Sequence, residues 1–381
     1  MIHADLKLVE NLFDLKVVGQ AATRDGFGKG LIEAGEKDSR VVVLCADLAE
    51  STRVLAFKEK FPERYIEVGV AEQNLATVAS GLAIYGKIPF ITSYATFSPG
   101  RNNEQIRTTI SLNNVPVKIA GAHAGVSVGP DGATHQALED LATMRAIPGM
   151  VVLAPCDVHE ARRATVAAAA HRGPVYLRFA REKTPVITTN RTPFHIGRAE
   201  VFRSGRDATI VACGPLIYEA LLAAECLAGN AEAIALLLSR YPNITERIRK
   251  PAGSYRHGPQ RKQVWTPVSI RAMLKRTDRL DVEVINSPSV KPLDISTIAK
   301  SAKKTGRVIT VEEHQTTGGL FGAVSEALAR VHPTAITPIG MPDSFGESGE
   351  PMELLEKYGM TAPFIIEALT RHHTDSRILR G

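Results

Sequence analysis

The chain has 381 residues, 44% of them hydrophobic and 23% charged, which is the composition of a globular protein large enough for two domains. Its apolar runs, such as VVVLCA, fall well short of the roughly 18 consecutive apolar residues that a membrane span needs, so we expect no membrane association. Residues 1–18 mix Asp, Glu and Lys with apolar positions, which argues against a secretory signal and favours the cytoplasm.

Charge and cysteine usage exclude two further classes. The net charge of +6 is concentrated in residues 229–280, where eleven Lys/Arg stand against three Asp/Glu. The rest of the chain is therefore about neutral, and we expect no nucleic-acid partner. The four cysteines include no C-x-x-C pair, so the sequence predicts neither a disulfide framework nor metal ligands.

Strand-like and helical stretches alternate after a leader of residues 1–18. The expected strands of the first series are RVVVLCAD, YIEVG, IPFITSY, VPVKIAG, MVVLAP and PVYLRFA. Amphipathic or Ala-rich stretches separate them, and this rhythm predicts βαβ units with a parallel sheet. We expect this first domain to cover residues 19–190.

A second series follows the polar connector at 187–199. It comprises the expected strands DATIVACG, DVEVINSPSV and RVITVEEH and the expected helices LIYEALLAAECLAG and GGLFGAVSEALARV. The sequence thus predicts an α/β protein of two domains, each a mostly parallel sheet flanked by helices, the second covering 191–372 and followed by a tail at 373–381.

Residues 229–280 interrupt the second series. They combine dense positive charge with clustered Pro and Gly and weak periodicity. We interpret them as a dispensable surface insertion, because loops accept long additions at modest entropic cost. A docking arm for nucleic acid or another partner is the alternative.

Polar residues collect where the strands of the first series end. They are Asp47, Ser51, Glu72, Tyr94, Phe97, His123, Asp131 and His135. Ligands of parallel α/β sheets bind outside the carboxyl ends of the strands, so this clustering predicts a site. Glu72 lies in the first turn of an expected helix, where an acid can also simply complement the helix dipole.

Glycines and arginines extend the same edge. The loop AGVSVGPDGATHQ needs unusual backbone dihedrals and can present two imidazoles and a carboxylate to one small polar ligand. Arg24, Arg178 and Arg181 are candidates to grip a phosphate, the last two because YLRFAR places them at a strand end.

A series of motifs then resembles a known family in chain order. The motifs are ATRDGFGKGL, ADLAES, EVGVAEQN, SPGRN, GPDGATHQALEDLATMRAIPGM, LAPCD, INSPSVKPLD, VEEHQTTGGL and FGESGEPMELLEKYGMT. Together they are similar to the C-terminal half of transketolase, particularly the small subunit of split transketolases, over nearly the whole chain.

The resemblance implies a thiamine diphosphate site. Glu72 would contact N1′ of the cofactor's aminopyrimidine and promote removal of the thiazolium proton. Phe97 would stack on that ring, Tyr94 would wall its pocket and Asp47 would lie near it.

The resemblance also implies that Arg24, Ser51, His123 and Arg181 hold a sugar phosphate. Asp131 and His135 would read its hydroxyls or assist proton movement. The implied reaction moves a two-carbon ketol unit from a ketose phosphate to an aldose phosphate, a step of the pentose phosphate pathway.

Two departures from the family pattern bear on this expectation. The glycine loop begins with His123-Ala124-Gly125 where many transketolases have His-Asp-Ser, and an acidic position before Asp131 is Pro130, which leaves the substrate preference open. The sequence also has no G-D-G followed by N-N, the family's site for Mg²⁺ and the cofactor's diphosphate.

We therefore expect a separate N-terminal subunit to supply the diphosphate site, in a heterotetramer of two subunit pairs, with VEEHQTTGGLFGAV serving mainly in assembly. The alternatives are the beta chain of a 2-oxo acid dehydrogenase, a fragment of deoxyxylulose phosphate synthase, or a catalytically silent assembly protein. The arginine, serine and histidine set favours a phosphorylated sugar over a branched oxo acid.

Overall fold

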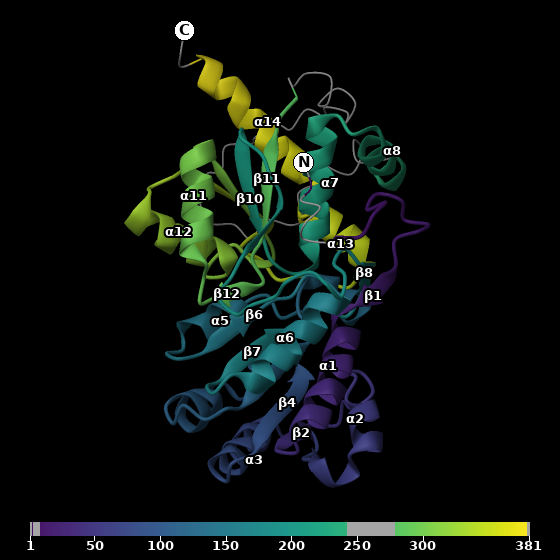
Figure 1. Ribbon diagram of the computed structural model, residues 1–381, viewed down its shortest axis with the longest axis vertical. Coiled ribbons are helices and arrows are strands. Elements are labelled where there is room, and N and C mark those ends of the chain that lie inside the picture. The colour runs from purple at the N-terminus through teal and green to yellow at the C-terminus, as the bar shows by residue number, and fades with distance from the viewer. Residues whose placement is uncertain (1, 3–7, 242–278, 379–381) are drawn as a thin grey trace.

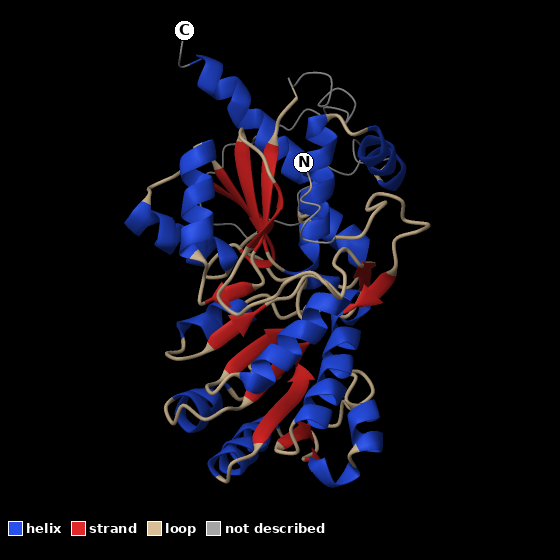
Figure 2. Ribbon diagram, in the orientation of Figure 1, coloured by secondary structure: helices blue, strands red, loops and turns tan. Residues whose placement is uncertain are grey.

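Two sheets, each flanked by helices, form the body of the protein. The computed structural model describes residues 2, 8–241 and 279–378, with side chains up to residue 370. The first sheet and its helices lie at the bottom of Figure 1 and the second sheet at the top. Figure 2 shows the helices arranged on both sides of the strands. The predicted fold class is confirmed.

The first sheet has the strand order β12-β6-β7-β5-β4-β2-β3. Its strands are β2 (Val41–Cys45), β3 (Tyr65–Glu67), β4 (Ile88–Tyr94), β5 (Lys118–Ala122), β6 (Val151–Leu153), β7 (Val175–Arg178) and β12 (Ser289–Lys291). Neighbours pair in parallel except β12, which joins β6 antiparallel. Because β12 comes from the second half of the chain, the two halves share this sheet.

Alternating side chains of β2 reach opposite faces of this sheet. Val43 belongs to the core shared with α1 and α6, whereas Leu44 belongs to the core shared with α3. The flanking helices are α1 (Thr23–Lys37), α2 (Leu55–Lys60), α3 (Glu72–Ile84), α4 (Asn103–Gln105), α5 (Asp140–Ala146) and α6 (Val158–Ala170). Short helical turns are η2 (Pro62–Arg64), η3 (Ile106–Ser111) and η4 (Val126–Asp131).

Close packing of α1 on α6 fixes the first of these helices against the sheet. A Cβ added at Gly26 would lie 2.1 Å from the carbonyl oxygen of Val158, so only glycine permits this approach. One turn of this helix also buries Phe27, whose ring stacks on Phe179 with centroids 4.9 Å apart. The start of α1, and with it Arg24, is thereby held at the carboxyl edge of the strands.

The second sheet has the order β14-β13-β10-β11-β9. Its strands are β9 (Glu200–Arg203), β10 (Ala208–Ala212), β11 (Val282–Asn286), β13 (Val308–Gln315) and β14 (Ile336–Met341). Neighbours are parallel except the pair β11 and β9. The helices are η5 (Gly214–Leu216), α7 (Ile217–Ala228), α8 (Ala231–Arg240), α11 (Ile295–Thr305), α12 (Leu320–Val331), α13 (Pro351–Lys357) and α14 (Ala362–Ile378).

Helix α7 is the centre of the second core. Nearly all of its side chains are buried, which agrees with its almost wholly apolar sequence IYEALLAAECLA. Part of the predicted leader also packs here, since Leu12 and Phe13 belong to the same core and the hydroxyl of Tyr218 donates to the carbonyl of Leu12 at 3.2 Å. A separate two-stranded antiparallel sheet of β1 (Gln20–Ala22) and β8 (Lys183–Pro185) lies beside α13 (Figure 1).

The described start of the predicted insertion is folded. Helix α8 lies within residues 229–280, and it buries Ala233 and Leu237 completely in the core around α7. Residues 242–278 of that predicted insertion lie outside the described residues. The domain boundaries drawn from the sequence stay predictions.

Candidate active site

Glu72 is the first residue of α3 and is 4% exposed. The turn before it is fixed by Glu67, whose Oε1 accepts the backbone N–H groups of Asp47 at 2.7 Å and Gly69 at 3.0 Å. Gly69 has a φ of 70°, a backbone conformation that favours glycine. Glycine at this position thus lets β3 run directly into a helix that begins with a buried carboxylate.

Two residues of the SPGRN segment hold Glu72 in place. The Nη1 atom of Arg101 lies 3.3 Å from Glu72 Oε2, and Asn102 donates from its side chain to the Glu72 carbonyl at 2.9 Å. The guanidinium of Arg101 also lies over the Phe97 ring, 4.2 Å from its centroid. Arg101 therefore contacts both Glu72 and Phe97, which places these two predicted site residues beside the same side chain.

Four rings form a cluster at the ends of β4 and β5. The ring of Tyr94 stacks on that of His123 at a centroid distance of 3.9 Å and lies 6.0 Å from that of Phe97. The ring of His135 meets Phe97 edge-on at 5.4 Å. The predicted site residues from β4, β5 and the glycine loop are thus brought together.

The side chains of Arg24 and His123 are in contact at the N-terminal end of α1. Arg24 Nη1 donates to the Ser51 carbonyl at 2.8 Å and lies 3.2 Å from His123 Nε2. A guanidinium only donates, so this ring nitrogen accepts, and the proton of the neutral ring is on Nδ1. Burial, together with the nearby Arg24, lowers the pKa of His123 to about 3.

Two hydrogen-bond donors of this pair of side chains remain unpaired. Arg24 Nε and His123 Nδ1 are buried and have no hydrogen-bond partner among the residues that the structure describes. Burial, with the positive charge of Arg53, also lowers the pKa of Arg24. Unpaired buried donors next to several cations are the arrangement that an anionic ligand group would satisfy.

The glycine loop closes the site from one side. Arg181 Nη1 donates to the Val128 carbonyl at 2.7 Å and lies 3.7 Å from Asp131 Oδ2. Both of these charged side chains remain about one-third exposed, so they are open to a ligand. His135 Nδ1 shares a hydrogen bond of 2.9 Å with the Thr134 hydroxyl.

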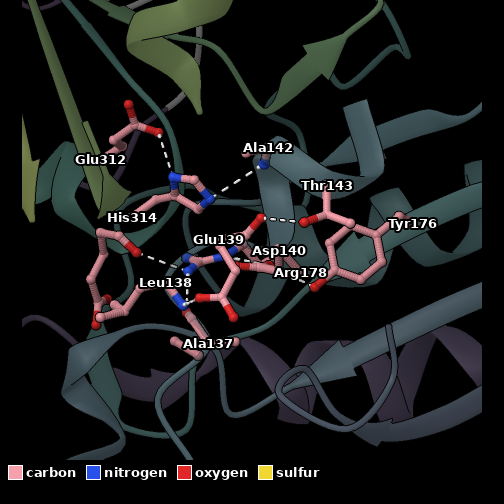
Figure 3. A network of polar contacts seen from close by, with 12 residues as sticks. Ala137, Leu138, Glu139, Asp140, Ala142, Thr143, Tyr176, Arg178, Glu312 and His314 are labelled. Carbon is pink, nitrogen blue, oxygen red and sulfur yellow. Dashed lines mark hydrogen bonds and ion pairs between the residues drawn. The ribbon is translucent and has the colours of Figure 1, made fainter. Parts of the chain in front are cut away.

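Arg178 does not join this site, contrary to the sequence-based prediction. It is 7% exposed, and its Nε donates to Asp140 Oδ2 at 2.8 Å. The same carboxylate accepts from the Tyr176 hydroxyl at 2.6 Å, and Arg178 Nη2 donates to the Glu313 carbonyl of β13 at 2.8 Å. Figure 3 shows this network between the two sheets, where Arg178 links the halves of the protein.

Among the site-forming residues, sequence reasoning missed Arg53, Arg101 and Asn102. Arg53 donates from Nε to Oδ1 of Asp25, the residue that follows Arg24 in the sequence, at 2.7 Å. The positive charge of Arg53 also helps to lower the pKa of His123. Arg101 and Asn102 are part of the SPGRN motif. Their contacts to Glu72 cross about 30 positions of sequence, so no local pattern shows them.

The described residues contain neither a cluster of metal ligands nor a membrane-spanning helix. Over the described ranges, no three His, Cys, Asp or Glu side chains gather as a metal ion would require. No helix in the described parts of the chain is long and apolar enough to cross a membrane.

Comparison with known proteins identifies the class. Residues 19–186 match the transketolase pyrimidine-binding domain, and residues 266–365 match the transketolase C-terminal domain. The chain belongs to the transketolase family, and its pyrimidine-binding domain implies binding of thiamine diphosphate.

Within this family the chain is similar to split members. It is 37% identical to the putative transketolase C-terminal section of Methanocaldococcus jannaschii, over 91% of this chain and 94% of that protein. It is 35% identical to the 6-deoxy-6-sulfo-D-fructose transketolase subunit SqwH of a Clostridium species, over 91% of this chain and 92% of that protein. A solved split-gene transketolase, described as an inactive beta4 tetramer, superposes with a TM-score of 0.74 and 37% identity over 93% of this chain and 98% of that chain.

Proposed function

We propose that the chain is the pyrimidine-binding and C-terminal subunit of a split transketolase. It moves a two-carbon ketol unit from a ketose phosphate to an aldose phosphate, as in the pentose phosphate pathway, and works in the cytoplasm. The observation that carries this proposal is the buried carboxylate of Glu72 at the start of α3, joined through Arg101 to the ring of Phe97.

The described residues fit the pyrimidine half of thiamine diphosphate. A buried acid, Glu72, shares the neighbour Arg101 with the ring of Phe97, which in turn pairs with the ring of Tyr94, and Asp47 follows the neighbouring strand β2. Glu72 would hold and exchange a proton at N1′, while the two rings would enclose the pyrimidine and exclude water. When bound, the cofactor supplies the carbon nucleophile that breaks and remakes the carbon–carbon bond of the substrate.

The unpaired donors Arg24 Nε and His123 Nδ1 support an anionic end on the substrate. With Ser51 and Arg181 they would hold a phosphate, and Asp131 and His135 would read the sugar hydroxyls or move a proton at the reacting carbons. The similar Clostridium subunit is named for a sulfo sugar, so an anion of another kind is the nearest competing substrate class.

A separate subunit would complete the site. We infer that it supplies the diphosphate and Mg²⁺ ligands and forms a heterotetramer of two subunit pairs with this chain. The description of the similar split-gene structure as an inactive beta4 tetramer supports the need for that second chain.

Reconstitution tests the proposal. The purified chain, a candidate partner carrying G-D-G and N-N, thiamine diphosphate and Mg²⁺ are mixed, and ketol transfer from xylulose 5-phosphate to ribose 5-phosphate is measured. Glu72→Gln should lower kcat by at least about 100-fold, because a positioned acid or base contributes about 10²- to 10⁴-fold. Glu59→Gln, a change on the exposed side of α2, is the matched control and should leave kcat unchanged.

Other outcomes would overturn the proposal. Full turnover by the Glu72→Gln complex would remove the assigned proton chemistry. Oxidative decarboxylation of a 2-oxo acid would favour the dehydrogenase beta chain, and condensation of pyruvate with glyceraldehyde 3-phosphate would favour the deoxyxylulose phosphate synthase. If no partner gives turnover, the result would favour the alternative that the chain is a catalytically silent assembly protein.

A further inference from the structure

Strand β13 carries two adjacent glutamates in its second half, and their carboxylates contact different parts of the protein. Glu312 and Glu313 are 1% and 4% exposed, and successive side chains of a strand point to opposite faces. Glu312 accepts the backbone N–H groups of Leu320 at 2.6 Å and Phe321 at 2.8 Å, at the start of α12 in its own half of the protein. Figure 3 shows Glu312 on the second sheet beside His314, whose Nδ1 lies 3.9 Å from Glu312 Oε2 and whose Nε2 accepts the backbone N–H of Ala142 at 3.3 Å.

Glu313 reaches across to the glycine loop of the first half, AGVSVGPDGATHQ at residues 124–136. Its Oε1 accepts the backbone N–H of Ser127 at 2.6 Å. That N–H lies in the first turn of η4, where backbone donors have no partner within the helix. A Cβ added at Gly125 would lie 2.2 Å from the same oxygen, so glycine is needed for the contact.

The second half of the protein also packs against later residues of the glycine loop. A Cβ added at Gly129 would lie 3.0 Å from Cγ of Pro351, and one at Gly132 would lie 2.5 Å from the Ser348 hydroxyl oxygen. The side-chain amide of Gln136 donates to the carbonyls of Val126 at 3.1 Å and Glu347 at 2.9 Å. The loop is thus enclosed between the second sheet's connections and the candidate site.

Packing around the glycine loop is incomplete beside Ser127. A cavity of about 230 Å³ is lined there by Ser127 and Glu313 together with Leu216, Tyr218, Pro351 and Leu355. Because packing is incomplete at this point, the hydrogen bond to Glu313 carries more of the task of fixing the loop.

We propose that Glu313 is a positioning residue: through the Ser127 N–H it fixes the glycine loop and thereby sets where Asp131 and His135 meet the substrate. This gives the second domain a direct part in shaping the substrate pocket. The assignment of Asp131 and His135 to substrate rests on the proposed function, whereas the fixing of the loop does not.

Hydrogen–deuterium exchange of the isolated full chain tests the fixing of the loop. Glu313→Ala should speed exchange in peptides covering residues 125–135 by about tenfold, because a charge-assisted hydrogen bond is lost. Glu313→Gln keeps an acceptor oxygen and should restore most of the protection. Glu312→Ala is the matched control, because the neighbouring buried carboxylate contacts α12 and should leave the exchange of the loop unchanged.

The opposite results would overturn the inference. Unchanged loop exchange in Glu313→Ala would do so, as would equal effects of Glu312→Ala and Glu313→Ala. If Glu313→Ala fails to fold, Ser127→Pro removes the donor instead, at the start of a short helix where proline is tolerated. Faster exchange of residues 128–135 in that variant supports the inference, and unchanged exchange overturns it.

A second measurement uses the reconstituted enzyme. Glu313→Ala should raise KM for the sugar phosphate about tenfold and leave the apparent affinity for thiamine diphosphate unchanged, whereas general destabilisation would affect both. Failure of ketol transfer in wild-type enzyme would overturn the proposed function and leave the exchange result intact. Equal changes in substrate and cofactor affinity would overturn the positioning role alone.

Discussion

The side-chain amide of Asn286, at the end of β11, donates a hydrogen bond of 2.7 Å to Oε1 of Glu160 in the first turn of α6. The other carboxyl oxygen of Glu160 accepts the backbone N–H of Cys156 at 2.7 Å. Glu160 is 1% exposed, and this pair joins the two halves of the protein. Burial, with the neighbouring charge of Asp157, raises the pKa of Glu160 to about 7.

Glu160→Gln should therefore change how stability depends on pH. The carboxyl holds its proton in the folded state up to about pH 7 but loses it near pH 4.5 when unfolded, so its contribution to stability falls as pH rises between these values. Glutamine does not titrate. The melting temperature of Glu160→Gln relative to wild type should increase from pH 5 to pH 8, measured by circular dichroism.

The glutamine also fits the site. Its oxygen can accept from Cys156. After the Asn286 amide rotates, the amino group of the glutamine can donate to the Asn286 oxygen, which is buried without a partner in the described parts of the chain. Exposed Glu59→Gln is the control for loss of one carboxylate. A constant difference in melting temperature between Glu160→Gln and wild type across this range would contradict the prediction.

His123 should remain neutral throughout the physiological pH range. Burial and Arg24 lower its pKa to about 3 from an ordinary 6.5, so its contribution to stability is present above pH 6.5 and is lost as pH falls toward 3. Long-range proton–nitrogen NMR should show one ring with the proton on Nδ1 from pH 5 to pH 8. His123→Asn identifies that signal by its loss. A ring proton on Nε2, or a titration midpoint within this range, would refute the assignment.

Lys118 provides a third test, at the opposite end of β5 from the site. It is fully buried, and its Nζ donates to the carbonyls of His171 and Gly173, each at 2.7 Å. Burial lowers its pKa to about 7, and a neutral amine retains the two N–H groups that these carbonyls need. Between about pH 7 and 10.5 the unfolded chain binds more protons than the folded one, so the contribution of Lys118 to stability rises with pH in this range.

Lys118→Met should therefore destabilise the protein more at pH 9.5 than at pH 7. It leaves two buried carbonyls unpaired, which costs about 1–3 kcal/mol each. Urea unfolding at both pH values measures the difference, with the exposed Lys87→Met as control. A smaller loss at the higher pH would show that the buried amine stays charged.

The gathering of the site residues could be predicted because parallel strands bring their carboxyl ends to one edge. Tyr94 and His123 are 29 positions apart, but the expected strands IPFITSY and VPVKIAG bring both to the same edge of the sheet, where their rings stack. The orientation of each side chain could not be predicted. Arg178 ends β7 and Arg181 follows three residues later, but the partner of Arg178 is Asp140, whose position depends on how the glycine loop returns to α5.

Two other features depend on contacts between distant segments. Strand β12, at Ser289–Lys291, pairs with β6 across the two halves of the chain, and no local periodicity shows such a partner. Helix α8 is not evident from the composition of residues 229–280, because most of the positive charge of that stretch lies after the helix. Its own stretch, AEAIALLLSR, is amphipathic, with Ala233 and Leu237 on the buried side.

Helix α8 is bound to α7 by polar contacts as well. Glu219 accepts from the Tyr241 hydroxyl at 2.9 Å, pairs with Arg240 at 2.9 Å and accepts the backbone N–H of Ala362 at 2.8 Å. Leu280, the last residue of the predicted insertion, is also buried in this core. These contacts make both described ends of the predicted insertion part of the second core.

Leu237→Ala should consequently destabilise the protein by about 2–4 kcal/mol, because it removes a fully buried side chain from a packed core. Leu112→Ala, at a side chain that is 77% exposed, should cost less than about 0.5 kcal/mol in the same urea titration. Deletion of residues 229–280 should then give an insoluble product, since it removes Leu237, Tyr241 and Leu280 together. A soluble deletion product, or equal effects of the two leucine changes, would restore the interpretation of this stretch as dispensable.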